Sequence, residues 1–301
     1  MSIKVALTHR TRYRYDKAVS LGPQAVQLRP APHCRTPILS YSLNVNPSDH
    51  LLNWQLDPYN NYLARILFSN KTKEFVVEVD LVAELSPFNP FGFFLEPSVI
   101  DYPFAYEPGL AKDLEPYLSV EPGGPLLQAF VGSVSGEKRG TISFLVELNQ
   151  RVRTEINYVT RLDPGVQTCE QTLEKRSGSC RDSAWLLVQI LRHLGIAARF
   201  VSGYLIQMAD ETASADGSGP QTDSADFHAW AEAFLPGAGW IGMDPTSGLF
   251  AGEGHIPLVC TPNASRAAPI EGTVEKAKVD FDFSISIRRL NDLPRVSKPF
   301  A

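Results

Sequence analysis

The chain has 301 residues, 44% of them hydrophobic and 20% charged, so it can bury a sizeable core as one large or two ordinary domains. The formal net charge of −5 argues against a general nucleic-acid binder, which would carry a basic excess. No segment approaches the roughly 20 apolar residues of a membrane helix, and the first residues show no signal-peptide pattern. We therefore expect a cytoplasmic protein with neither a membrane nor a nucleic-acid partner, and its oligomeric state stays open.

The four cysteines are scattered along the chain without the spacing of a disulfide framework or a zinc site. In a chain of this length they are most simply reduced thiols. No acidic segment has the spacing of a calcium loop. The sequence thus predicts no metal and no cofactor.

The first hundred residues read as a β-rich domain. Residues Val5 to Tyr15 alternate between two faces, as in a strand with one buried side. Five further strands with regular turns favour an antiparallel β-sandwich, namely Ala25–Leu28, Leu39–Val45, Leu51–Leu56, Tyr62–Phe68 and Glu74–Glu84. We expect this domain to span residues 1–100 of an α+β protein.

Residues 101–301 read as a second domain that mixes helices and strands. Helical patterns cover 109–118, 125–131 and 142–158, whereas Phe281–Ile287 is expected to add a strand to this same domain. Between them, the polar stretch 208–224 is either a lid over a cleft or an insertion without a role.

The most informative stretch begins at Arg176 and leads through a small polar turn into Cys180. From Cys180 to Leu194 the chain is apolar almost all round, which is typical of a buried helix, and Gly195 is a good stop signal. Cys180 therefore lies in the first turn, where free backbone N–H groups and the helix dipole favour an anion. A cysteine in that position is a candidate nucleophile.

A nucleophilic cysteine needs a base and a group that orients the base. Asp226–Phe234 and Trp240–Thr246 read as two strands of a hairpin around a Pro/Gly turn. His228 is near the start of the first strand and Asp244 near the end of the second. Side chains alternate along a strand, so the two face the same side only if the loop has an odd number of residues or the hairpin has a bulge.

Taken together, these motifs resemble the bacterial transglutaminase-like superfamily, which has a papain-like fold and a Cys-His-Asp triad. The motifs are Gly178-x-Cys180-x-Asp182, Leu194–Arg199, Ser202-Gly203-Tyr204, His228–Glu232 and Trp240-x-x-x-Asp244-Pro245-Thr246. They cover about residues 140–250. The first hundred residues look more loosely like the β-rich N-terminal domain that often precedes this core. The resemblance implies a central helix packed on an antiparallel sheet.

The resemblance also implies roles for three residues: Cys180 as nucleophile, His228 as general base and acid, and Asp244 as the residue that orients His228. Four further residues are expected to support the site or to contact substrate. Asp182 stabilises the helix start, Tyr204 and Tyr158 are candidates for lining the pocket, and Trp230 belongs to the hairpin.

The function expected from this site is hydrolysis of an amide, peptide or isopeptide bond through a thioester on Cys180, with a protein or peptide as substrate. Two alternatives stay open. One is a transglutaminase, in which an amine resolves the thioester. The other is a non-catalytic binding module, in which the β-rich domain recruits a partner.

Overall fold

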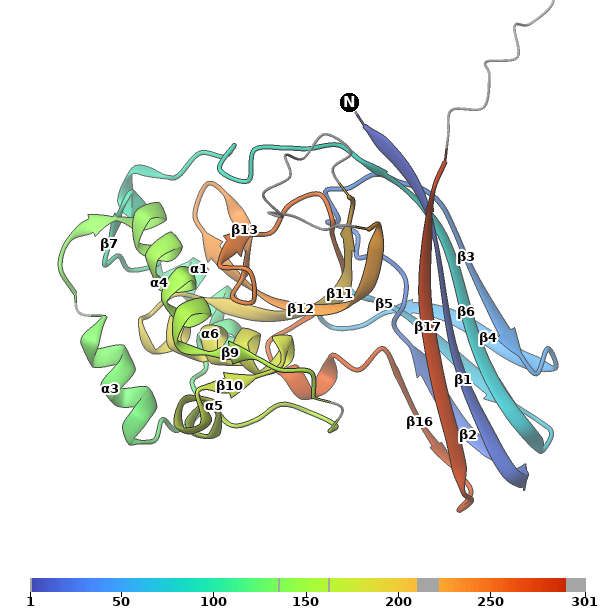
Figure 1. The fold of residues 1–301 in the computed structure, drawn as a ribbon. Coiled ribbons are helices and arrows are strands. Elements are labelled where there is room, and N and C mark those ends of the chain that lie inside the picture. The colour runs from blue at the N-terminus through green and yellow to red at the C-terminus, as the bar shows by residue number, and fades with distance from the viewer. Residues whose placement is uncertain (1, 135, 162, 210–221, 291–301) are drawn as a thin grey trace, which may run out of the picture.

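The computed structural model describes residues 2–134, 136–161, 163–209 and 222–290 (Figure 1). Helices α3, α4, α5 and α6 gather at one end of the molecule, and the long strands β1, β3, β6 and β17 lie at the other, with β11 to β13 between them. All the larger sheets are antiparallel, and the α+β fold class predicted from the sequence is confirmed.

Two four-stranded sheets form what we call the two-sheet unit. Trp54 of one sheet contacts Tyr41 of the other with ring centroids 6.2 Å apart, and Phe68 contacts Phe75 at 5.5 Å, so the sheets pack face to face. In spatial order the sheets contain β17 (Val279–Arg289), β1 (Ile3–Val19), β6 (Thr72–Leu85) and β3 (Ile38–Asn46), and β16 (Ile270–Val274), β2 (Leu21–Val26), β5 (Tyr62–Phe68) and β4 (His50–Leu56).

The C-terminal strands do not extend the second domain, contrary to the sequence-based expectation. β17 pairs antiparallel with β1, and β16 pairs with β2. The polar faces of β1 and β17 complement each other, since Arg12 lies 2.9 Å from Asp282 across the ladder. Alternation predicts a strand but does not specify which sheet it joins, so the expectation failed on a long-range pairing.

The remaining elements form the core that carries the candidate site. Its central helix α6 is buried at every residue from Asp182 to Arg192, and it ends before Gly195, whose φ of +78° suits glycine. The helices are α1 (Pro108–Asp113), α2 (Glu115–Leu118), α3 (Pro125–Ser133), α4 (Thr141–Glu155), α5 (Cys169–Lys175) and α6 (Cys180–His193), with 3-10 turns at Pro97–Val99 and Ala264–Arg266.

A five-stranded sheet lies against α6. On β12, Ala229, Ala231 and Ala233 share a buried cluster with α6, because alanine lets the helix approach the sheet closely. Trp230, on the opposite face, packs with Val201 and Cys260. The strands are, in spatial order, β14 (Leu249–Phe250), β13 (Gly239–Asp244), β12 (Ser224–Leu235), β11 (Ala198–Gln207) and β15 (His255–Thr261). Two short ladders join β7 (Asp101–Tyr102) to β8 (Arg139–Gly140), and β9 (Asn157–Tyr158) to β10 (Ser177–Gly178).

Most of the 208–224 stretch, predicted as a lid or an inert insertion, lies outside the described residues. At its far end, Asp223 accepts a hydrogen bond from the backbone N–H of Ala209 at 2.9 Å and pairs with Arg289 of β17. Within the described ranges, no helix is long and apolar enough to cross a membrane.

Candidate active site

Cys180 is the first residue of α6. Ser179 caps the helix, and Asp182 completes a capping box by accepting from the Ser179 backbone N–H at 2.8 Å. At this position the N–H of Cys180 has no acceptor within its own helix, and it lies at the positive end of the helix dipole. The Gly178 turn thus delivers a half-buried thiol to a helix start that favours an anion.

Asp182 is fully buried and holds the chain segments around the cysteine together. Its carboxylate accepts two hydrogen bonds from Arg161, at 3.0 Å each, and one from the backbone N–H of Gln167 at 2.7 Å. Burial opposes ionisation, but these bonds and those from Ser179 outweigh it and lower the pKa of Asp182 to about 2. The expected supporting role is therefore matched by a carboxylate that ties three chain segments together.

The hairpin that carries His228 and Asp244 has the geometry that the sequence argument requires. Leu235 pairs with Gly239, so three residues form the loop, and Ala231 pairs with Met243 further along the ladder. In this register His228 and Asp244 form a diagonal pair on one face of the sheet. Both side chains are buried, with 9% and 2% of their surface exposed.

The two side chains lie at ion-pair distance, with Nε2 of His228 3.1 Å from Oδ1 of Asp244. Burial disfavours the imidazolium, but contacts with Asp244 and with the Cys180 thiol outweigh burial and raise the pKa of His228 to about 10. Burial likewise opposes ionisation of Asp244, yet His228 and His255 hold the pKa of this carboxyl well below its usual range. Because Nε2 is directed at Asp244, Nδ1 is the nitrogen left for Cys180.

His255 is a residue that sequence reasoning considered as a support for the cleft but to which it gave no catalytic role. It begins β15, and its Nε2 lies 3.6 Å from the second oxygen of Asp244. Its Nδ1 accepts a hydrogen bond from the backbone N–H of Gly252 at 3.2 Å, which leaves the proton of a neutral ring on Nε2, facing the carboxylate. Only the pairing of β15 with β11 brings His255 here, and no local motif signals it.

Among the residues that the structure describes, two sets of side chains have donor atoms close enough to hold a metal ion. His228, Asp244 and His255 form one set, within 4.8 Å of one another, and this set coincides with the candidate triad. The other is His33, Glu232 and Cys260, but Arg199 already pairs with Glu232 at 2.6 Å. Arg199 therefore supplies the positive charge that a cation would bring to Glu232.

The remaining residues expected at the site differ in burial: Tyr204 and Trp230 are buried, whereas Tyr158 is exposed. Tyr204 is fully buried, and its hydroxyl bonds to Nδ1 of His9 on β1 at 2.8 Å, which corrects the expectation that it lines a substrate pocket. Its ring stacks on Phe227, the neighbour of His228, so Tyr204 supports the strand segment that carries His228. Trp230 is also buried, with its ring centroid 6.3 Å from that of His228.

The side chain of Tyr158 is exposed, with 54% of its surface accessible to solvent. It pairs with Gly178 in the ladder of β9 and β10, two residues before Cys180. Contact between substrate and Tyr158 stays a prediction.

A cysteine at a helix start, facing a histidine and an aspartate on neighbouring antiparallel strands, defines the papain-like class of cysteine proteins. Comparison with known families agrees with this class. Residues 5–84 match the bacterial transglutaminase-like N-terminal region, and residues 128–245 match the transglutaminase-like superfamily core. The chain therefore belongs to the transglutaminase-like superfamily and carries its bacterial N-terminal region.

Individual relatives match from about half to most of the chain. An uncharacterized protein of Mycobacterium tuberculosis strain H37Rv is 25% identical over 279 residues, which is 89% of this chain and 86% of the relative. An uncharacterized protein of Mycobacterium leprae is 28% identical over 139 residues, 46% of this chain and 47% of the relative. Among solved structures, a candidate cysteine protease from Cytophaga hutchinsonii superposes with a TM-score of 0.70 at 18% identity, over 97% of this chain and 92% of that one, and so shares the fold.

Proposed function

We propose that the protein is a cysteine-dependent hydrolase that cleaves an amide, peptide or isopeptide bond of a protein or peptide substrate through a thioester on Cys180. The contact of His228 with both Cys180 and Asp244 carries this proposal, because it raises the pKa of the imidazole to about 10. An imidazole with that pKa holds its proton at neutral pH and can give it to a leaving amine.

In the first half of the reaction, the Cys180 thiolate attacks the carbonyl carbon of the scissile bond. The oxygen of the tetrahedral intermediate takes up the negative charge, and the backbone N–H of Cys180 at the start of α6 stabilises it. His228 then gives its proton to the leaving amine, the C–N bond breaks, and a thioester remains on Cys180. Asp244 keeps the imidazole ring oriented throughout.

In the second half, neutral His228 takes a proton from water, and the resulting hydroxide attacks the thioester. The C–S bond breaks, the carboxylic acid leaves, and the thiolate and imidazolium are restored. A primary amine in place of water would give the transamidation product of a transglutaminase. The nucleophile that resolves the thioester distinguishes the two activities.

The first experiment measures iodoacetamide labelling of each thiol between pH 5 and 9 by mass spectrometry, in the wild type and in His228→Ala. Burial raises the pKa of the Cys34 thiol to about 11 and that of Cys169 to about 12, so both serve as slow internal references. We expect Cys180 alone to react fast below pH 7 and to lose this reactivity without His228. Slow labelling of all four thiols would leave the non-catalytic binding module as the explanation.

The second experiment identifies the reaction. The wild type and Cys180→Ala are incubated with a fluorogenic peptide library and, separately, with dimethylcasein and a fluorescent primary amine. Cleavage by the wild type alone supports the hydrolase. Amine incorporation without cleavage would replace it by the transglutaminase, and equal turnover by Cys180→Ala would exclude Cys180 as the nucleophile.

A further inference from the structure

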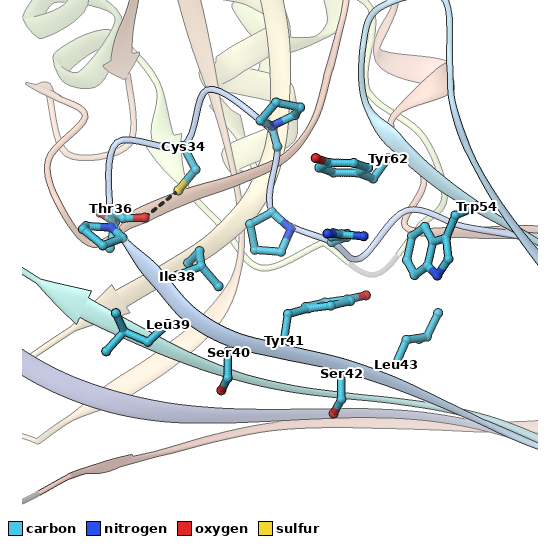
Figure 2. Close-up of a pocket in the computed structure, with 15 residues that line it drawn as sticks. Cys34, Thr36, Ile38, Leu39, Ser40, Tyr41, Ser42, Leu43, Trp54 and Tyr62 are labelled. Atoms are coloured by element: carbon cyan, nitrogen blue, oxygen red, sulfur yellow. Dashed lines mark hydrogen bonds between the residues drawn. The ribbon is translucent and has the colours of Figure 1, made fainter.

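A cavity of about 670 Å³ opens in the two-sheet unit, in a part of the chain to which the proposed chemistry assigns no role (Figure 2). It lies between β3 and β4, each of which is an edge strand of its sheet. Residues 29–43 form most of its wall, and Trp54 and Tyr62 complete it. The volume is within the range of about 300–1,000 Å³ that is typical of ligand sites.

The guanidinium of Arg29 lies inside this cavity among three aromatic rings. Its central carbon is 4.2 Å from the ring centroid of Tyr62, 5.4 Å from that of Trp54 and 5.6 Å from that of Tyr41. Stacking uses the faces of the guanidinium and leaves its N–H edge for acceptors. Over the ranges that the structure describes, Arg29 has no carboxylate partner, so the cavity offers a half-buried cation to an anion.

The hydroxyl of Tyr41 gives a second, independent indication of a missing ligand. It is buried and has no hydrogen-bond partner among the described residues. Burial raises the pKa of Tyr41 although Arg29 opposes the shift, so the phenol keeps its proton and can donate it. Buried hydroxyls nearly always have a partner, and a ligand oxygen would supply one. Figure 2 shows the Tyr41 and Tyr62 rings facing each other across the cavity.

The third feature is the free edge of β3. In the described part of the chain this strand pairs with β6 alone, and residues Ile38 to Leu43 line the cavity continuously. An edge strand directs alternate N–H and C=O groups outward, and an extended peptide can pair with them as an additional strand. A ligand lying in the cavity along β3 therefore finds main-chain partners as well as Arg29.

We propose that this cavity binds an extended peptide that carries a carboxylate. The peptide backbone pairs with the β3 edge, and its carboxylate accepts hydrogen bonds from the Arg29 guanidinium and the Tyr41 hydroxyl. Apolar side chains of the wall, namely Ile38, Leu43 and the prolines of the 30–37 segment, contact the neighbouring side chains of the peptide. This binding is independent of the reaction at Cys180.

The cavity wall is joined directly to the core. The backbone N–H of Ala31 donates to the carbonyl of Pro257 at 2.8 Å, and the hydroxyl of Thr36 donates to the carbonyl of Glu253 at 2.6 Å. These two carbonyls flank His255, which contacts Asp244. A peptide bound in the cavity therefore contacts the 30–37 segment. This segment is in turn hydrogen-bonded to the residues on either side of His255.

The test uses the full chain with Cys180→Ala, so that nothing is cleaved. An array of random octapeptides with Glu at one central position is compared with the same array carrying Gln there. The best Glu octapeptide is then labelled with fluorescein, and its affinity is measured by fluorescence anisotropy. Arg29→Gln is compared with Arg65→Gln, which removes the same charge from an exposed position of β5 outside the cavity.

We expect the Glu peptide to bind, Arg29→Gln to weaken it about tenfold or more, and Arg65→Gln to change it less than about twofold. Tyr41→Phe, which keeps the ring packing, should weaken it about threefold or more, and this variant decides if Arg29→Gln does not fold. Methylation of the peptide backbone nitrogens should also weaken binding. The proposal is overturned if no octapeptide binds, if Glu and Gln peptides bind alike, or if Arg65→Gln weakens binding as much as Arg29→Gln.

Discussion

Gly203 lies directly opposite His228 in the ladder between β11 and β12. A Cβ at residue 203 would collide with the backbone carbonyl of Ile256 on β15 and would lie 2.7 Å from the Trp230 ring. The absence of a side chain at Gly203 thus lets β15 approach β11 closely, and β15 begins with His255. The glycine therefore lets the strand that begins at His255 lie close to the strand that pairs with His228.

Gly203→Ala should therefore lower the free energy of unfolding by about 2 kcal/mol or more, since backbone atoms cannot yield as a flexible side chain can. Urea unfolding followed by tryptophan fluorescence measures the change. Gly132→Ala in α3 is the control, because nothing lies within 4 Å of its added Cβ and alanine favours a helix. Equal stability of Gly203→Ala and the wild type would show that β15 moves away at little cost.

Removing the carboxylate of Asp244 should reduce kcat/KM on the order of 10³-fold, because the imidazole of His228 loses the group that orients it and stabilises its charge. The variant is Asp244→Asn, measured on whichever peptide the library experiment identifies. Asp226→Asn, two residues before His228 on the exposed part of the same strand, should keep nearly full activity. A loss of similar size in both variants would contradict a specific role for Asp244.

The buried pair of His228 and Asp244 also predicts how stability depends on pH. The pKa of His228 rises from 6.5 to about 10 on folding, so its contribution is complete below pH 6.5 and is lost as the pH rises towards 10. The pKa of Asp244 falls on folding, so its contribution is lost at acidic pH. The stability difference between the wild type and Asp244→Asn should be largest near pH 5–6 and shrink steadily up to pH 10. A difference that stays constant from pH 6 to 10 would argue against the charged pair.

Asp182 should matter for stability more than any exposed acid nearby. Asp182→Ala leaves buried N–H groups of Gln167 and Ser179 without their acceptor and Arg161 without its buried partner, at a cost of about 3 kcal/mol. Asp163→Ala removes a carboxylate that is 79% exposed and 3.5 Å from the same arginine, and should cost less than about 1 kcal/mol. Chemical denaturation measures the free energy of unfolding of both variants. Equal losses of stability would refute the role of Asp182 in holding the three chain segments together.

His255 should act through Asp244 and not on the substrate. His255→Ala should lower kcat about tenfold with little change in KM, because the carboxylate loses one of its two histidine contacts and keeps His228 and the backbone N–H of Thr246. His50→Ala in the two-sheet unit, whose ring bonds to the Pro47 carbonyl, is the matched control. A large rise in KM in His255→Ala would instead indicate direct contact with substrate.

Local patterns in the sequence were sufficient for much of this structure. The alternation of β1, the apolar helix that begins at Cys180 and the hairpin around Pro236 each depend on neighbours close in the chain. Local geometry also set the requirement that His228 and Asp244 need an odd loop or a bulge, and the pairing of Leu235 with Gly239 meets it with a loop of three residues. These features come from periodicity and turn chemistry, which a single sequence contains.

Long-range packing set the limit of sequence reasoning. Tyr204 was expected in a pocket, but β1 covers it through His9, which is about two hundred residues away in the chain. His255 reaches Asp244 only because β15 pairs with β11 beyond a break in register. Arg29 shows no local motif either, and its surroundings are formed by three strands that fold together.

The pairing of β17 with β1 and of β16 with β2 has a consequence for how the chain is made. Both sheets of the two-sheet unit need a strand from the last part of the chain, so the unit is completed only after the whole core has left the ribosome. During synthesis, β1 and β2 each keep one edge unpaired until β16 and β17 are made. The helix α6 and its sheet form from the chain that lies between these two pairs of strands. A fragment that stops after β15 would expose those two edges to other chains, and a circular permutant that joins the two ends of the unit would close them early.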